Sequence, residues 1–188
     1  MTEYVVTNPV TGERIEPLVT ADETDGEYTR ARITVAPGGE GPPEHVHPSY
    51  DETFEVEKGT LVVHADGERR VLGEGESTTV ERGTPHFFRN PHEDHEAVVV
   101  GEARPAGRTA EIIMTLCGLA HEGKLDEDGG PSLLQAAVMG DEFSDDTRFT
   151  SPPPVVQDVF HTIVAPVGRA FGYTATYDRF LEDDYWRD

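Results

Sequence analysis

Histidine is concentrated in one stretch of this 188-residue chain: six of the eight histidines lie between His45 and His95. Within that stretch, His45 and His47 are two residues apart, and Glu52 follows after a short turn that contains a proline. Side chains two positions apart on an extended strand point to the same face. The spacing therefore predicts that two imidazoles and the Glu52 carboxylate converge on one point.

A second stretch can supply a third imidazole. Gly83 permits a tight turn with positive φ, and Pro85 stiffens the chain before His86, so His86 can approach from a more distant strand. Three neutral imidazoles and one carboxylate suit one divalent transition metal ion (Fe, Mn, Ni, Cu or Zn) and leave positions open for water, O₂ or a bidentate substrate. A closed structural zinc site more often uses cysteine, and the single Cys117 is distant in sequence.

These two stretches resemble the paired motifs of the cupin superfamily, G-x5-H-x-H-x4-E-x6-G and G-x5-P-x-G-x2-H-x3-N. The first motif is matched at all its fixed positions, which are Gly39, His45, His47, Glu52 and Gly59. The second is matched at Gly75, Gly83, His86 and Asn90, with Glu81 where the family usually has proline. The resemblance implies a double-stranded β-helix, a small jelly-roll barrel, that holds one metal ion through His45, His47, Glu52 and His86.

The five remaining histidines are expected to be structural or solvated rather than ligands. His92 and His95 lie in a polar loop after the last candidate ligand, where contact with a substrate at the pocket rim is the alternative. His64 lies on an expected strand, and His161 lies within an expected helix. His121 lies near a helix C-terminus, where its charged form would interact favourably with the helix dipole.

Three other polar side chains near the candidate ligands could bind or transfer protons. Tyr50 and Glu44 are close to His45 and His47 in sequence, and we expect both on the surface of the turn. Arg89 could bind a substrate carboxylate, but an outward position on its strand is favoured. The sequence therefore identifies no catalytic residue.

The elements that must position these side chains are short strands separated by glycine and proline. Alternation of apolar and polar residues predicts strands over 29–36, 53–58, 60–65, 68–72, 77–81, 86–89 and 96–102. Many short strands at this spacing are typical of a sandwich or barrel. The fold class is therefore mainly β, a cupin barrel followed by C-terminal α-helices, and we expect the barrel with N-terminal strands to occupy residues 1–105.

Residues 106–188 are expected to form a helical extension packed on the barrel. Apolar spacing predicts a helix over 110–121, a capping box at Ser132 opens a second helix, and three prolines precede a third that Pro166 should interrupt. The extension is similar, more weakly, to that of uncharacterised single-domain cupins. Its helices are expected to serve as a packing or dimer element, with a lid over the metal as the alternative.

The charge excludes several classes of partner. The chain has 37 acidic and 15 basic residues, giving a net charge of −22, which repels nucleic acid and anionic membranes. Evenly spread acid with only two lysines resembles the proteins of halophiles that accumulate salt. The N-terminus lacks the pattern of a signal peptide, and no apolar stretch is long enough to span a bilayer. We expect a cytoplasmic protein.

The expected function is that of a small metalloenzyme, of dioxygenase or isomerase type, acting on a small organic molecule. The alternative is a metal-containing module that binds or senses a small molecule without turnover. A storage role is disfavoured because storage proteins of this family often lose the ligands that this chain keeps. The family resemblance also implies a homodimer, since cupins often pair through sheet edges or faces.

Overall fold

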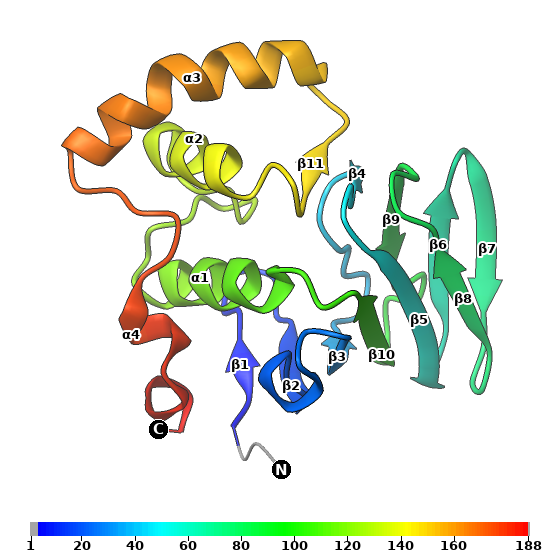
Figure 1. Ribbon diagram of the computed structural model, residues 1–188. Helices are drawn as coiled ribbons and strands as arrows, with labels where there is room; N and C mark the ends of the chain where they lie inside the picture. The colour runs from blue at the N-terminus through cyan, green and yellow to red at the C-terminus, as the bar shows by residue number, and fades with distance from the viewer. Residues whose placement is uncertain (1–3, 188) are drawn as a thin grey trace.

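The computed structural model describes residues 4–187, which form two antiparallel sheets and a layer of C-terminal helices (Figure 1). The six-stranded sheet has the order β1-β2-β3-β10-β5-β8, and the five-stranded sheet has the order β11-β4-β9-β6-β7. The strands are β1 (Val6–Thr7), β2 (Arg14–Val19), β3 (Thr29–Val35), β4 (His45–Val46), β5 (Asp51–Lys58), β6 (Leu61–Ala65), β7 (Glu68–Leu72), β8 (Ser77–Val80), β9 (His86–Arg89), β10 (Ala97–Arg104) and β11 (Arg148–Phe149). The expected fold class, mainly β with C-terminal helices, is confirmed.

The space between the two sheets holds an apolar core. Strand β5 shows the reason: Phe54 and Val56 are buried, whereas Glu55 and Glu57 on the other face are exposed. The same alternation on both sheets gives a cluster of buried side chains, which are Val35, Phe54, Val56, Leu61, Val63, Ala65, Leu72, Val80, Phe88, Ala97 and Val99. Burial of this apolar surface holds the two sheets face to face.

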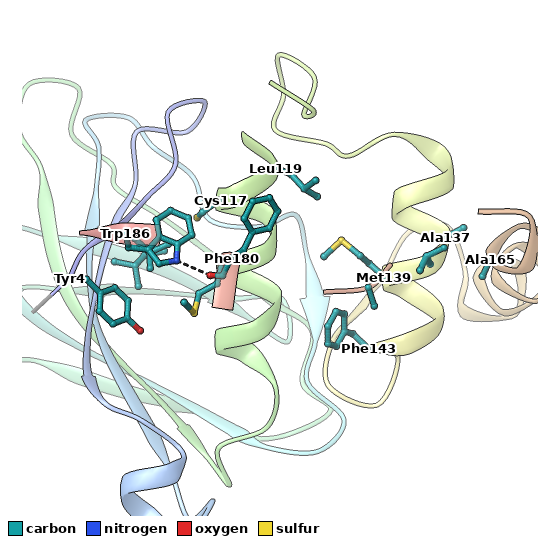
Figure 2. Close-up of a cluster of buried hydrophobic side chains, with 14 residues drawn as sticks. Tyr4, Cys117, Leu119, Ala137, Met139, Phe143, Ala165, Phe180 and Trp186 are labelled. Atoms are coloured by element: carbon teal, nitrogen blue, oxygen red, sulfur yellow. Dashed lines mark hydrogen bonds between the residues drawn. The ribbon is translucent and has the colours of Figure 1, made fainter. Parts of the chain in front are cut away.

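The helices pack on one side of this sandwich. They are α1 (Thr109–His121), α2 (Leu133–Glu142), α3 (Pro154–Ala170) and α4 (Asp178–Leu181), with short 3₁₀ turns at Asp22–Thr24 and Asp183–Trp186. A second core joins them to the N-terminal strands: Tyr4, Val6 and Ile15 pack in one cluster with helical residues that include Cys117 and Phe180 (Figure 2). The indole of Trp186 donates a hydrogen bond to the carbonyl of Phe180 at 2.8 Å.

Two expectations about helix ends are confirmed and one is wrong. Ser132 caps α2 by accepting a hydrogen bond from the Gln135 amide, and Pro154 occupies the first turn of α3. Pro166, however, does not interrupt the third helix, which continues to Ala170. Pro166 lies on the exposed side of α3, so the missing amide bond is lost at a face that water can reach, and the packed face keeps the helix continuous.

The division at residue 105 into a barrel and an extension stays a prediction. The N-terminal strands share their core with the helices, so the two parts contact each other extensively. Within residues 4–187, none of the helices combines the length and the apolar character that crossing a bilayer would require.

Candidate metal centre

Four side chains from the two sheets meet inside the barrel. His45 on β4 and His86 on β9 belong to the five-stranded sheet, where they are paired across the two strands, and Glu52 belongs to β5 of the facing sheet. His47 follows β4 directly. The Nε2 atoms of His45 and His47 are 3.2 Å apart, and Glu52 Oε2 lies 2.9 Å from His86 Nε2 and 3.4 Å from His47 Nε2. One possible ligand atom from each residue lies within 4.8 Å of the others. The structure thus brings all four predicted residues together.

A backbone carbonyl fixes the orientation of each imidazole. The Nδ1 atom of His45 donates to the carbonyl of Pro43 at 2.9 Å, and that of His86 donates to Thr84 at 2.8 Å. The Nδ1 atom of His47 donates to the carbonyl of Asp146 at 2.9 Å. A carbonyl oxygen can only accept, so each Nδ1 carries hydrogen, and the Nε2 of each neutral ring presents a lone pair.

This arrangement of nitrogen lone pairs fits a bound cation. The Nε2 atoms of His45 and His47 face each other, although both are acceptors when the rings are neutral. Two acceptors at 3.2 Å repel each other unless a proton or a metal ion lies between them. All three imidazoles are at least nine-tenths buried, so water gives them little stabilisation. A donor set of three imidazoles and one carboxylate is suited to a transition metal ion.

The electrostatics of the cluster hold most of these groups in the form that binds a metal. Burial raises the pKa of Glu52, but the charge of His47 and His86 when protonated, and the hydrogen bonds that their Nε2–H groups then donate, together outweigh burial and place the pKa well below its usual range. Burial, reinforced by the neighbouring imidazoles, lowers the pKa of His45 to about 4. For His86, burial lowers the pKa, but the hydrogen bond that its protonated ring donates to Glu52, the charge of Glu52 and the Thr84 carbonyl together outweigh burial, and the net shift is upward.

The turn that precedes His86 forms although it lacks the proline that the family usually has. The amide of Thr84 donates to the carbonyl of Glu81, and Gly83 adopts a φ of +78°, as its glycine predicted. The Gly83 amide then donates to the carbonyl of His47 at 2.9 Å. Replacing proline by Glu81 therefore leaves the turn and the direction of His86 intact.

Tyr50 lies beside the four clustered side chains, and the expectation that it lies on the surface is wrong. Its side chain is fully buried, its ring stacks on that of His47 at 4.2 Å between centroids, and its hydroxyl lies 3.4 Å from His47 Nε2. The Thr109 hydroxyl donates to the Tyr50 hydroxyl at 2.8 Å. Gly107 allows this close packing, because a Cβ at that position would lie 2.7 Å from the Tyr50 ring.

The segment between α2 and α3 is a part of the site that the sequence did not reveal. Strand β11 pairs with β4, with Phe149 opposite His45, and so covers the edge of the five-stranded sheet (Figure 1). Just before β11, the Asp146 carbonyl and the Thr147 hydroxyl, at 3.2 Å, contact Nδ1 of His47. A two-residue strand has no periodicity to detect, so the sequence carried no signal for this contact.

The remaining candidates lie away from the cluster. His64 stacks on Phe87, His121 contacts Thr7, and the ring of His161 lies against Gly140. Arg89 lies on the face of β9 opposite to His86, and Glu44 is exposed and accepts a hydrogen bond from Thr150. His92 and His95 stack on each other in an exposed loop, where Asp94 contacts His95 at 2.7 Å.

Together, the fold and the site define a jelly-roll protein with three imidazoles and one carboxylate gathered between its sheets. Residues 31–101, which contain all four of these side chains, match the family described as the cupin domain. This match confirms, over residues 31–101, the family that the two motifs indicated.

Several known proteins are similar to this chain. It is 28% identical over 163 residues to the probable oxidoreductase patJ of Penicillium expansum, a match that covers 84% of this chain and 50% of that protein. It is 27% identical over 158 residues to the probable oxidoreductase virH of Hypocrea virens, a match that covers 78% of this chain and 70% of that protein. The chain spans about half the length of the patJ proteins that it matches. An RmlC-like cupin from Shewanella frigidimarina shares 22% identity, with a TM-score of 0.47 over 55% of this chain and 86% of that one.

Proposed function

We propose that this protein binds one divalent transition metal ion through His45, His47, Glu52 and His86 and acts on a small organic molecule there. The observation that carries the proposal is the convergence of three Nε2 atoms, each oriented by a carbonyl at Nδ1, and one partly buried carboxylate on a common point. A bound metal ion would act as a Lewis acid toward a carbonyl, enolate or hydroxy-acid group. Oxidoreductase chemistry of dioxygenase type is favoured over isomerase chemistry, because the two fungal relatives are named probable oxidoreductases.

The chain's own residues would orient the substrate. The Tyr50 hydroxyl accepts from Thr109, so its own hydrogen is free to point toward the cluster, where it can donate to a substrate oxygen. Glu52 is ionised at neutral pH and is held between His47 and His86, so it keeps a negative charge at the centre. The three imidazoles are buried, so water competes little with these contacts, which strengthens them.

The experiment combines metal analysis with turnover. Purified protein is loaded with Fe²⁺, Mn²⁺, Ni²⁺, Cu²⁺ or Zn²⁺, and O₂ uptake is measured with a panel of enolic, catecholic and 2-hydroxy-acid compounds. We expect uptake with one metal and one class of compound, and its loss in His86→Ala but not in His64→Ala. His64 is a matched control because it lies on the neighbouring strand, stacked on Phe87 and outside the cluster. No uptake with any combination of metal and compound would contradict the oxygenase assignment.

The second candidate is a module that binds a small molecule at the same centre without turning it over. It would show saturable binding of one of these compounds to the loaded protein and leave the compound unchanged. Under either candidate, the partner is a small molecule rather than nucleic acid or a membrane. The net charge of −22 disfavours nucleic acid and anionic membranes, and it motivates a cytoplasmic, salt-rich setting for the protein.

A further inference from the structure

Helix α3 has an apolar face that the described part of the chain, residues 4–187, leaves uncovered. Its inner face packs on α2: Gln157, Ala165 and Gly168 are buried, and a Cβ on Gly168 would lie 2.7 Å from the side chain of Val138. The outer face carries exposed apolar residues four positions apart, and Figure 1 shows α3 lying along the outside of α2. The exposed set is Val155, Val156, Val159, Ile163, Val167 and Phe171.

The exposed apolar residues of α3 contrast with the high content of acidic residues in this chain. Ile163 is 64% exposed and Phe171 is 76% exposed, and residues four apart on a helix lie on neighbouring positions of one face. Scattered exposed apolar residues are ordinary on a protein surface, but a continuous stripe along a whole helix indicates a contact surface. The charge and the symmetry of this face indicate the kind of partner that it accepts.

The near absence of charge on α3 allows a second copy of this acidic chain to approach it. Residues 150–172 contain one acid, Asp158, and one arginine, Arg169, in a chain with 37 acidic residues. Two copies of a molecule with a net charge of −22 repel each other, and residues 150–172 add little to that repulsion. A helix that lies on a membrane usually has a polar face rich in lysine and arginine, which α3 lacks.

The order of the apolar residues is symmetric about Ile163. When two α3 helices pack antiparallel across a twofold axis at this residue, Val159 meets the partner's Val167, and Val155 meets the partner's Phe171. A twofold interface requires such self-complementarity of one surface.

We propose that α3 is the interface of a homodimer in which two copies of this chain pack antiparallel across Ile163. This interface is a helix face, and it does not include the edge strand β7 of the five-stranded sheet. The proposal is independent of the chemistry at the metal centre. Within the protomer, Asp158 contacts Arg148 and Arg169 contacts Asp141, so both charged residues of α3 are paired on its inner side and its outer face is left apolar.

Light scattering after size exclusion tests this directly, in both low and high salt. We expect the wild-type protein at twice the protomer mass of 20.7 kDa, Ile163→Glu at the protomer mass, and Val71→Glu still dimeric. Val71 is the matched control because it is half exposed and lies on β7. A wild-type protein that is monomeric at all concentrations and salts, or a dimer lost in Val71→Glu and kept in Ile163→Glu, would overturn the proposal.

A second variant keeps the test valid if Ile163→Glu fails to fold. The residue at the twofold axis meets its own copy there, so in Ile163→Cys the two introduced thiols would lie within reach of a disulfide. This variant should form a covalent dimer on mild oxidation, and Val71→Cys should not. The native Cys117 does not interfere, because it is buried. Equal cross-linking of both variants, or pelleting of a monomeric wild-type protein with neutral or anionic vesicles, would contradict the dimer.

Discussion

The backbone carbonyl of Asp146 accepts a hydrogen bond from Nδ1 of His47 at 2.9 Å, across 99 positions of the chain. Asp146 itself is anchored, because its carboxylate accepts from the Arg108 amide at 2.9 Å at the start of α1. The region that follows the barrel therefore orients one of the four candidate ligands. A contact to the second nitrogen of a ligating histidine fixes the tautomer and the direction of the ring.

Asp146→Ala should weaken metal binding although no candidate ligand is changed. Loss of the contact with Arg108 frees the 146–147 backbone, so His47 is oriented less firmly, and we expect a drop in affinity of about tenfold or more. Competition with a chelator measures it. The matched control is Asp145→Ala, since Asp145 is the exposed neighbour, and an equal loss in both variants would contradict the role of Asp146.

Tyr50→Phe should leave metal binding unchanged and weaken the binding of an oxygen ligand beside the metal. The ring still stacks on His47, but the hydroxyl that can donate to a bound oxygen is gone. We expect the affinity of Co²⁺-loaded protein for the bidentate probe acetohydroxamate to fall about tenfold, as for the loss of one hydrogen bond of ~1.4 kcal/mol. Tyr28→Phe is the control, because the Tyr28 ring packs against Arg104 and not against the four clustered side chains. Unchanged affinity in Tyr50→Phe would contradict a role for Tyr50 in binding the probe.

Gly107→Ala should destabilise the protein more than a glycine substitution in an open turn. Gly107 has a φ of +56°, and a Cβ there would also meet the Tyr50 ring, whereas Gly67 has a φ of +75° and open space around it. We expect a loss of about 1 kcal/mol for Gly67→Ala and about 2–3 kcal/mol for Gly107→Ala. Urea unfolding of the metal-free proteins measures both, and equal losses would show that Tyr50 can move aside.

Metal affinity should fall on acidification, because a proton on His86 competes with the metal ion. The pKa of His86 is raised in the metal-free protein, so below that pKa its proton must leave before a metal can bind. The pKa values of His45, about 4, and of Glu52 are lowered, so these groups do not compete above that range. We expect the affinity to fall by at least about one decade per pH unit below the pKa of His86. Calorimetric titrations across the acid range measure this slope, and a slope near zero would contradict the prediction.

The candidate ligands could be predicted from the sequence because their geometry is local. The two-residue repeat of a strand fixes His45 relative to His47, and the turn at Gly83 directs His86, so spacing alone carries most of the information. The alternation of Phe54 and Val56 with glutamates likewise revealed which face of β5 is buried.

The rest of the site depends on contacts that spacing does not encode. Tyr50 looked like a turn residue, and it is buried only because Gly107 and Thr109, more than 50 residues later, close over it. The carbonyl of Asp146 is a backbone atom and has no signature in the sequence. Pro166 was expected to break α3, but packing of Ala165 and Gly168 against α2 outweighs one missing hydrogen bond.

The central claim is that His45, His47, Glu52 and His86 hold one metal ion, and titration of metal-free protein with Co²⁺ tests it most directly through the visible absorption of the bound ion. We predict one site per chain in the wild-type protein and in His64→Ala, and loss of most of the binding in His86→Ala while its circular dichroism stays that of a folded protein. The absence of a stoichiometric site in the wild-type protein, or equal binding by His86→Ala and His64→Ala, would contradict the claim.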